Sequence, residues 1–292
     1  MDNAQLLLNL ALEGIATGSV YALVAIGFSL LWWLGDLVHL AHGGVLLAAG
    51  YAMFYVLAVL GWPVWVAFPA GIVVAIAVGL VIDRLIYLPM LARGSSEMAL
   101  LTASLGALIV FEYALTLLFG PEGVTLDAGT LRTPLTPELL AVDWYAVIAV
   151  GGTLLLFGGV TLFMRVSSTG KAMRAVAENR ELARILGMDT QAVYRKTSML
   201  AAGLVAPASI LLLHSTGMAP HESLHIVLVA AVIAILGGRG SILGALVGGL
   251  FIGLVESVMQ WQFAAGWRQL VTFSVLYALL LVRPQGLFGA KA

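Results

Sequence analysis

The chain is divided into apolar runs long enough to cross a lipid bilayer as helices, since a membrane-spanning helix needs about 20 predominantly apolar residues. Only 10% of its 292 residues are charged, against roughly 25% in soluble domains. A β-barrel would show short alternating segments instead of continuous runs. We therefore predict an all-α polytopic membrane protein with about nine transmembrane helices, in a range of about eight to ten. The nine runs are Leu6–Leu34, Val38–Leu60, Trp62–Leu88, Glu97–Phe119, Trp144–Met164, Thr197–Leu213, Leu224–Leu236, Ile242–Gln262 and Trp267–Val282.

Two of these runs have unusual lengths. The seventh is short, and the first is long enough to be tilted or to be broken near Gly18. No basic segment precedes the first run, so we expect no cleavable signal peptide. We treat residues 1–292 as a single transmembrane domain.

The positions of Lys and Arg predict the orientation, because cytoplasmic loops are enriched in both. When the segment Arg165–Lys196 is placed in the cytoplasm and nine spans alternate, twelve of the fourteen Lys and Arg residues fall on the cytoplasmic face. The N-terminus then lies outside and the C-terminus inside. Residues 120–143 form the largest extracytoplasmic loop, which is too small to be an enzyme domain.

The segment Arg165–Lys196 is the main polar interruption and holds seven of the fourteen Lys and Arg residues. We predict one amphipathic helix over Thr169–Gly187, with Ser168 or Thr169 as its N-cap and Gly187 at the C′ position. Asp189 or Thr190 would cap a second helix. One face of the first helix is apolar and the other charged, with Arg174 and Glu178 paired at i,i+4. The apolar face consists of Ala172, Ala175, Val176, Leu182, Ala183 and Leu186.

Two roles fit this amphipathic helix. It could lie on lipid headgroups, or it could dock into a groove on a soluble motor subunit. Acidic residues are interleaved with the basic ones, alanine fills much of the apolar face, and the helix has no Trp or Phe to anchor it in lipid. These features favour docking on a protein.

Small residues recur at a spacing of four, which lets transmembrane helices approach closely. Ordinary packing explains most of them, although the eighth span could also slide against a neighbour or face a pathway. The three stripes are Gly14, Gly18 and Ala22; Gly71, Ala75 and Gly79; and Gly240, Gly244 and Gly248.

Four motifs, in order along the chain, resemble the permeases of branched-chain amino-acid ABC importers, a family that also serves amides and urea. Each motif is weak alone, but together they span nearly the whole sequence. They are Thr17-Gly-Ser-Val-Tyr-Ala-Leu-Val-Ala-Ile-Gly27 followed by Leu40-Ala-His-Gly43; Gly170-Lys-Ala-Met-Arg-Ala-Val-Ala-Glu-Asn179; Ile235-Leu-Gly-Gly-Arg-Gly-Ser241; and Pro284-Gln-Gly-Leu-Phe-Gly289.

The resemblance implies one membrane subunit of an ATP-driven importer in the bacterial inner membrane. Its partners would be a second permease subunit in a heterodimer, two ATPase subunits that use ATP and Mg, and a periplasmic binding protein. The chain has no Gly-x-x-x-x-Gly-Lys-Ser/Thr motif, so we expect no enzyme activity and no cofactor in it. Its net charge of −1 gives no reason to expect nucleic acid. By the resemblance, the residues that couple to the ATPase are Gly170, Lys171, Arg174, Ala175, Glu178, Asn179, Ala183, Leu186 and Gly187.

Ionisable groups inside a membrane are costly and suggest function. Glu112 and Glu256 lie within the fourth and eighth spans, although either could instead serve a structural hydrogen bond. Gly43 and Gly44 could break the second helix and expose backbone groups to a ligand. The candidate pathway residues are His42, Gly43, Gly44, Glu112, Gly237, Gly238 and Glu256. We expect no metal site, although His214, His221 and His225 lie near one another in sequence.

The sequence departs from the family at two charged positions. Relatives often have Glu after Ala-His-Gly, where this chain has Gly44, and some carry Lys where Val229 aligns. Either the solute is less polar than leucine, or the binding protein supplies most of the specificity. Two other functions stay open from the residues alone: an ion-coupled secondary transporter or channel without an ATPase, and a membrane scaffold.

Overall fold

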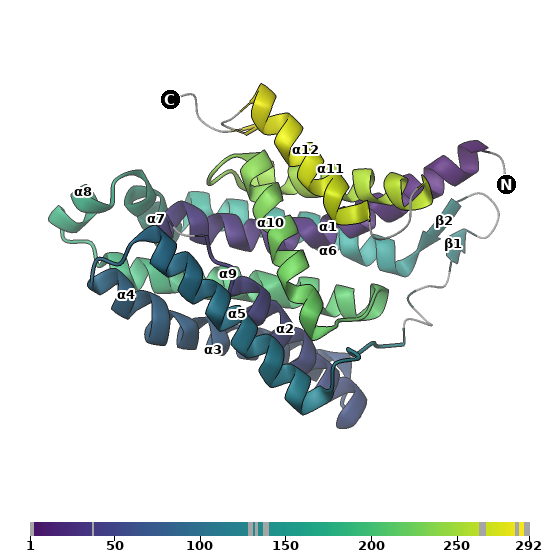
Figure 1. The fold of residues 1–292 in the computed structure, drawn as a ribbon, viewed down its shortest axis with the longest axis horizontal. Coiled ribbons are helices and arrows are strands. Elements are labelled where there is room, and N and C mark those ends of the chain that lie inside the picture. Colours follow the sequence, from purple (N-terminus) through teal and green to yellow (C-terminus); the bar gives the residue numbers. More distant parts are fainter. Residues whose placement is uncertain are drawn as a thin grey trace.

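The computed structural model describes residues 3–36, 38–127, 131, 134–136, 140–262, 267–283 and 286–288. It is a helical bundle with one small two-stranded sheet (Figure 1). The elements are α1 (Asn3–Gly35), α2 (His42–Phe54) with the π-helical turn η1 (Tyr55–Val59), α3 (Val64–Ile82) with η2 (Asp83–Tyr87) and α4 (Leu88–Ala92), α5 (Glu97–Phe119), β1 (Pro134–Thr136), β2 (Leu140–Asp143), α6 (Trp144–Val166), α7 (Ser168–Glu178), α8 (Arg180–Ile185), α9 (Thr190–Ser215), η3 (Pro220–Glu222), α10 (Ser223–Gly237), α11 (Ile242–Gln262) and α12 (Arg268–Val282).

The all-α polytopic prediction is confirmed. Among the described residues, eight helical segments are long and apolar enough to cross a membrane, and a ninth, Leu270–Val282, is apolar but shorter. The first span is one continuous helix, so the break that we considered near Gly18 is absent. A helix can continue through a glycine when a neighbouring helix packs against it, and α11 packs against Gly18.

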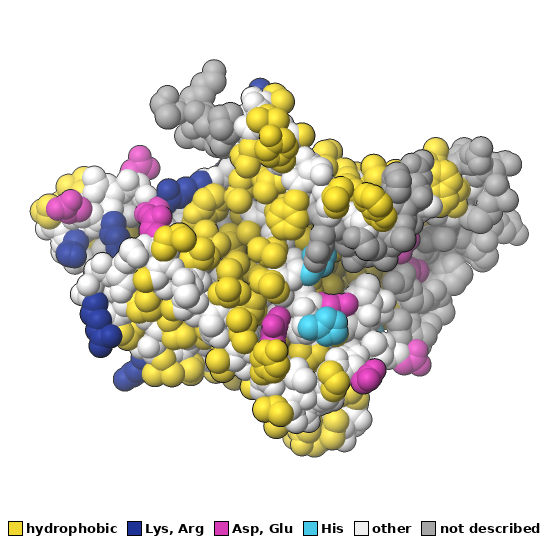
Figure 2. All heavy atoms as spheres, in the orientation of Figure 1, with side chains coloured by type: hydrophobic (Ala, Val, Ile, Leu, Met, Phe, Trp, Pro, Cys, Tyr) yellow, Lys and Arg dark blue, Asp and Glu magenta, His cyan; other side chains and the backbone are white. Residues whose placement is uncertain are grey.

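The centre of the bundle is α1. Of its most apolar window, 89% is buried inside the molecule, whereas the corresponding share in α6 is 22%. Figure 1 shows α1 running along the long axis, with the N-terminus at one end and α8 at the other. The outer helices turn large apolar side chains outward, among them Leu117 on α5 and Leu155 on α6. Figure 2 shows that hydrophobic side chains cover much of one face of the molecule. Such a surface suits lipid or another membrane subunit.

Glycines bring α1 and α11 into close backbone contact. A Cβ added to Gly18 would lie 2.6 Å from the carbonyl oxygen of Gly249, and one added to Gly249 would lie 2.7 Å from the Cα of Ala22. Gly253 lies as tightly against Gly14 and Gly18. We call this contact the α1–α11 seam. It shows that the stripe in the first span serves internal packing.

The segment that we expected to be the extracytoplasmic loop contains the sheet. Strands β1 and β2 pair antiparallel, and the Asp143 carboxylate accepts a hydrogen bond from the Ala146 N–H at 2.8 Å, so it caps α6. Val124 pairs with Met218, which ties this loop to the end of α9. The loop positions 128–130, 132–133 and 137–139 lie outside the described residues.

We expect Gly253→Ala to lower the free energy of unfolding by about 1–3 kcal/mol, because a methyl group has no room in the seam. The matched control is Gly106→Ala on α5, where nothing lies within 4 Å of the added Cβ. That change should be neutral or slightly stabilising, since alanine is the better helix former. Thermal unfolding in detergent measures both. Equal stability of the two variants would contradict the seam's importance.

Candidate functional site

The polar segment folds into two helices, not the single helix over Thr169–Gly187 that we predicted. The backbone of Asn179 is extended, at φ −153° and ψ 99°, and its side chain accepts a hydrogen bond from the N–H of Leu182 at 2.8 Å. Asn179 therefore ends α7 and caps α8. The cap of α7 is Ser167, through a 2.8 Å bond from the Gly170 N–H, and not Ser168 or Thr169.

The other two caps are as predicted. Gly187 has φ +84° at the end of α8, and its N–H bonds to the carbonyl of Arg184 while the N–H of Met188 bonds to that of Ala183. This is a Schellman motif, in which glycine tolerates the left-handed conformation. Asp189 caps α9 by accepting from the Ala192 N–H at 2.9 Å.

The first of the two helices is attached to the bundle. Gly170 packs against the backbone of Met164, 2.6 Å from where a Cβ would stand, and Met173 and Val176 are buried. The Arg174 guanidinium donates to the carbonyl oxygen of Met164 at 2.7 Å, which binds α7 to the end of α6. This bond takes the place of the expected pairing with Glu178.

The second helix turns its apolar side chains away from the bundle. Ala183 is buried, whereas Leu182, Ile185 and Leu186 are 51%, 75% and 71% exposed. The single apolar face that we predicted is therefore divided by the break at Asn179. Val176 and Ala183 pack inward, and Leu182 and Leu186 face outward. The remaining coupling candidates Lys171, Ala175 and Glu178 are exposed on α7.

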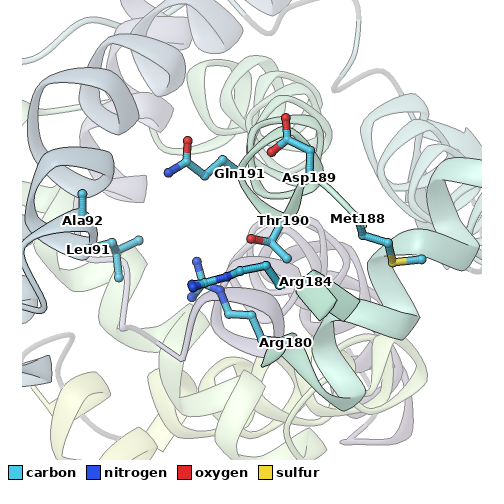
Figure 3. Close-up of a pocket in the computed structure, with 8 residues that line it drawn as sticks. All are labelled: Leu91, Ala92, Arg180, Arg184, Met188, Asp189, Thr190 and Gln191. Atoms are coloured by element: carbon cyan, nitrogen blue, oxygen red, sulfur yellow. The ribbon is translucent and has the colours of Figure 1, made fainter. Parts of the chain in front are cut away.

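A groove of about 570 Å³ adjoins α8, and we call it the α8 groove. Its walls come from the end of α4, from α8 and from the start of α9. Figure 3 shows the guanidinium groups of Arg180 and Arg184 extending from α8 across the groove toward Leu91. The remaining lining residues are Ala92, Met188, Asp189, Thr190 and Gln191. On the face in Figure 2, Lys and Arg side chains gather at this end of the molecule.

The second group of candidates surrounds the start of α2. Gly43 and Gly44 do not break a helix, because α2 begins at His42 and both glycines lie in its first turn. A Cβ on Gly43 would stand 3.0 Å from Leu108 and from the carbonyl oxygen of Ser223, and one on Gly44 would stand 3.1 Å from Phe111. The glycines therefore allow α5 and α10 to approach α2.

Hydrogen bonds to α5 also hold the start of α2 in place. Ser104 accepts from the Ala41 N–H at 2.9 Å and from the Tyr87 hydroxyl at 2.7 Å. His39, in the connection between α1 and α2, packs its ring against Tyr87 at 4.7 Å.

The two membrane glutamates are both hydrogen-bonded. Glu112 on α5 is half-buried and accepts a 2.5 Å bond from the Ser223 hydroxyl at the start of α10. Glu256 on α11 is buried and accepts from the Tyr21 hydroxyl at 3.0 Å and the Thr272 hydroxyl at 2.6 Å. Glu256 therefore links α1, α11 and α12. Both glutamates therefore make hydrogen bonds of the kind that a structural role requires, and their role in a pathway stays a prediction.

Gly237 and Gly238 form the turn between α10 and α11. Gly237 lies against Gly244, and Gly238 ends α10 with φ +90°. The Leu287 N–H donates to the carbonyl of Leu236 at 2.7 Å, so the C-terminal motif caps α10. Pro284, Gln285 and Gly289 of that motif lie outside the described residues.

A buried polar cluster that we did not predict surrounds Asp83. Asp83 is fully buried beside Ser198, and Tyr87 and Tyr194 lie near it. The sequence shows Asp83 directly before Arg84, at the point where we placed the end of a span, and so it did not stand out. The π-helical turn η2 carries Asp83 and Tyr87 together, and such turns often occur at functional sites.

Comparison with known proteins identifies the family. The model of the branched-chain amino acid transport system permease component matches residues 10–282. The chain belongs to this family. It is similar to the high-affinity branched-chain amino acid transport permease LivH of Escherichia coli (31% identity, 95% of this chain and 94% of LivH) and to BraD of Pseudomonas aeruginosa (29%, with 95% and 94%).

A solved structure shares the fold. This structure is PsaBC from Streptococcus pneumoniae in complex with a Fab. The match has a TM-score of 0.53 and 17% sequence identity, and it covers 94% of this chain and 91% of the PsaBC chain. The family makes this protein a membrane permease subunit of an ABC importer, whose ATPase activity lies in partner subunits. The ion-coupled transporter and the scaffold that the residues left open are thereby set aside.

We expect Glu256→Leu to lower the free energy of unfolding by about 2–4 kcal/mol, since it withdraws an acceptor from two buried hydroxyl groups. Adding Tyr21→Phe and Thr272→Val should recover part of the loss. Unfolding in detergent and the apparent KM for uptake measure the effect. A raised KM with unchanged stability would instead assign Glu256 to solute binding.

Proposed function

We propose that this subunit passes branched-chain or other hydrophobic amino acids across the inner membrane and receives the work of ATP hydrolysis at α8. The observation that carries the proposal is that α7 is attached to the bundle whereas α8 exposes apolar side chains. Buried side chains and the Arg174–Met164 bond fix α7 to the bundle, while α8 presents Leu182, Ile185 and Leu186 beside a basic groove.

The exposed face of α8 suits a soluble protein partner. An apolar centre with a charged rim is the usual anatomy of a protein interface, and here Arg180 and Arg184 supply the rim. A force applied to α8 reaches the membrane helices through two covalent routes, because α7 leads back to α6 and Asp189 leads directly into α9. The ATPase subunit would bind here, and a second permease subunit would complete a heterodimer.

The uncharged residues at two interior positions favour a weakly polar solute. The two positions where relatives often carry charge are packed in this chain, since Gly44 faces Phe111 and Val229 is fully buried. Selection among solutes would then rest mainly on the periplasmic binding protein. Uptake of leucine, alanine, amides and urea by the reconstituted importer, with the cognate binding protein, would identify the solute. If the solutes taken up differ from those that the binding protein binds, the assignment of solute selection to the binding protein is wrong.

We expect Leu186→Asp to reduce ATP-dependent uptake at least tenfold, because a buried charge in a docking interface costs more than 1.4 kcal/mol. The control with the same charge change is Ser168→Asp. Ser168 is exposed in the first turn of α7, where an acidic residue interacts favourably with the helix dipole. Copurification of the ATPase and uptake in proteoliposomes measure the effect. Full ATPase association in the Leu186→Asp complex would overturn the docking site.

Orientation can be tested directly because the chain has no cysteine. With the N-terminus outside, Glu122→Cys should react with a membrane-impermeant maleimide in intact cells, and Ser168→Cys only after permeabilisation. Both residues are exposed in the structure. The reverse labelling pattern would invert the topology and place α8 outside.

A further inference from the structure

A second groove lies between the rod formed by α3, η2 and α4 and the first turns of α9. Its volume is about 590 Å³, and it shares no lining residue with the α8 groove. We call it the α3–α9 groove. Its lining residues are Leu80, Asp83, Arg84, Leu88, Ala192, Arg195, Lys196 and Met199.

The polar half of the groove is basic. Arg84, Arg195 and Lys196 are exposed, whereas Asp83 is fully buried beneath them. The accessible charges are therefore three cations from two helices. Nothing in the proposed ATPase docking uses these three residues.

The apolar half of the groove lies further into the two candidate spans than the cations. Leu80 precedes Arg84 by one helical turn in Val64–Ala92, and Met199 follows Arg195 by one turn in Thr190–Ser215. The two helices are antiparallel there, since Gly79 faces Ala202, with 3.3 Å between an added Cβ and the Cβ of Ala202, while Asp83 four residues later faces Ser198 four residues earlier. Leu80 and Met199 consequently lie on the bilayer side of the cations.

We infer that the α3–α9 groove binds one anionic phospholipid. The three cations suit its phosphate, and Leu80 and Met199 offer an apolar surface to an acyl chain. Basic pockets between transmembrane helices on the cytoplasmic side bind anionic headgroups in this way. A soluble protein could not reach the apolar half inside the bilayer. Only the assignment to the cytoplasmic leaflet rests on the orientation under the proposed function.

The lipid would also connect the two walls of the α8 groove. Leu91 and Ala92 at the end of the α3–α4 rod line that groove, and so do Thr190 and Gln191 at the start of α9. A phospholipid held between the same two elements fixes their spacing. Anionic lipid should therefore strengthen ATPase binding without contacting the ATPase.

The test is native mass spectrometry of the full chain, titrated with phosphatidylglycerol or phosphatidylcholine. We expect the unaltered protein to retain phosphatidylglycerol selectively. The double variant Arg195→Gln/Lys196→Gln should bind it about 30-fold more weakly, since each basic side chain contributes on the order of fivefold. The exchange Arg195→Lys/Lys196→Arg keeps the charge and should keep the binding.

The matched control is Arg165→Gln/Arg283→Gln, which removes two exposed cations outside the groove. It should retain phosphatidylglycerol. Equal loss in this control, equal retention of phosphatidylcholine, or binding of inorganic phosphate with the same affinity would each overturn the lipid site. Leu186→Asp separates the two proposals, because it should abolish ATPase association and leave lipid binding intact.

Discussion

The structure depends on backbone contact between α1 and α11. Lipid supplies little hydrophobic force between helices, so the attraction must come from dispersion at short range. Gly18, Gly249 and Gly253 let the two backbones touch along the seam. Polar links close it at both ends: the Ser257 hydroxyl donates to the carbonyl oxygen of Leu10 at one end, and Asp36 pairs with Arg239 at the other. Because α1 also packs against α6, α9 and α10, the seam fixes the position of α11 relative to these helices.

A rigid bundle would allow a force on α8 to reach the membrane helices. A short helix transmits force only if its attachment is stiffer than its docking surface. The attachment is stiff here, since α7 packs through Gly170 and bonds through Arg174 to the end of α6. The docking surface that we propose is one exposed face of α8, which the chain connects to α6 through α7 and directly to α9. A partner that moves α8 therefore moves α6 and α9 together.

The sequence predicted the features that depend on local chemistry. Hydropathy located the spans, and Gly187 and Asp189 marked true helix ends because caps need particular residues. The break at Asn179 was missed, since the helical periodicity continues across it and asparagine occurs both inside helices and at caps. Asp83 was missed because its burial is set by α9, which is distant in sequence. Long-range contacts of this kind decide burial and leave little trace in one chain.

The candidate pathway residues are engaged in holding one subunit together. Gly43 and Gly237 sit against the backbone of neighbouring elements, and Glu112 and Glu256 accept hydrogen bonds from hydroxyl groups. Groups used in this way have little capacity left for a zwitterion. The outer helices, by contrast, carry apolar surface that one subunit does not cover. If a second permease subunit joins this one, as we propose, a solute pathway at their boundary fits this chain better than one through its interior.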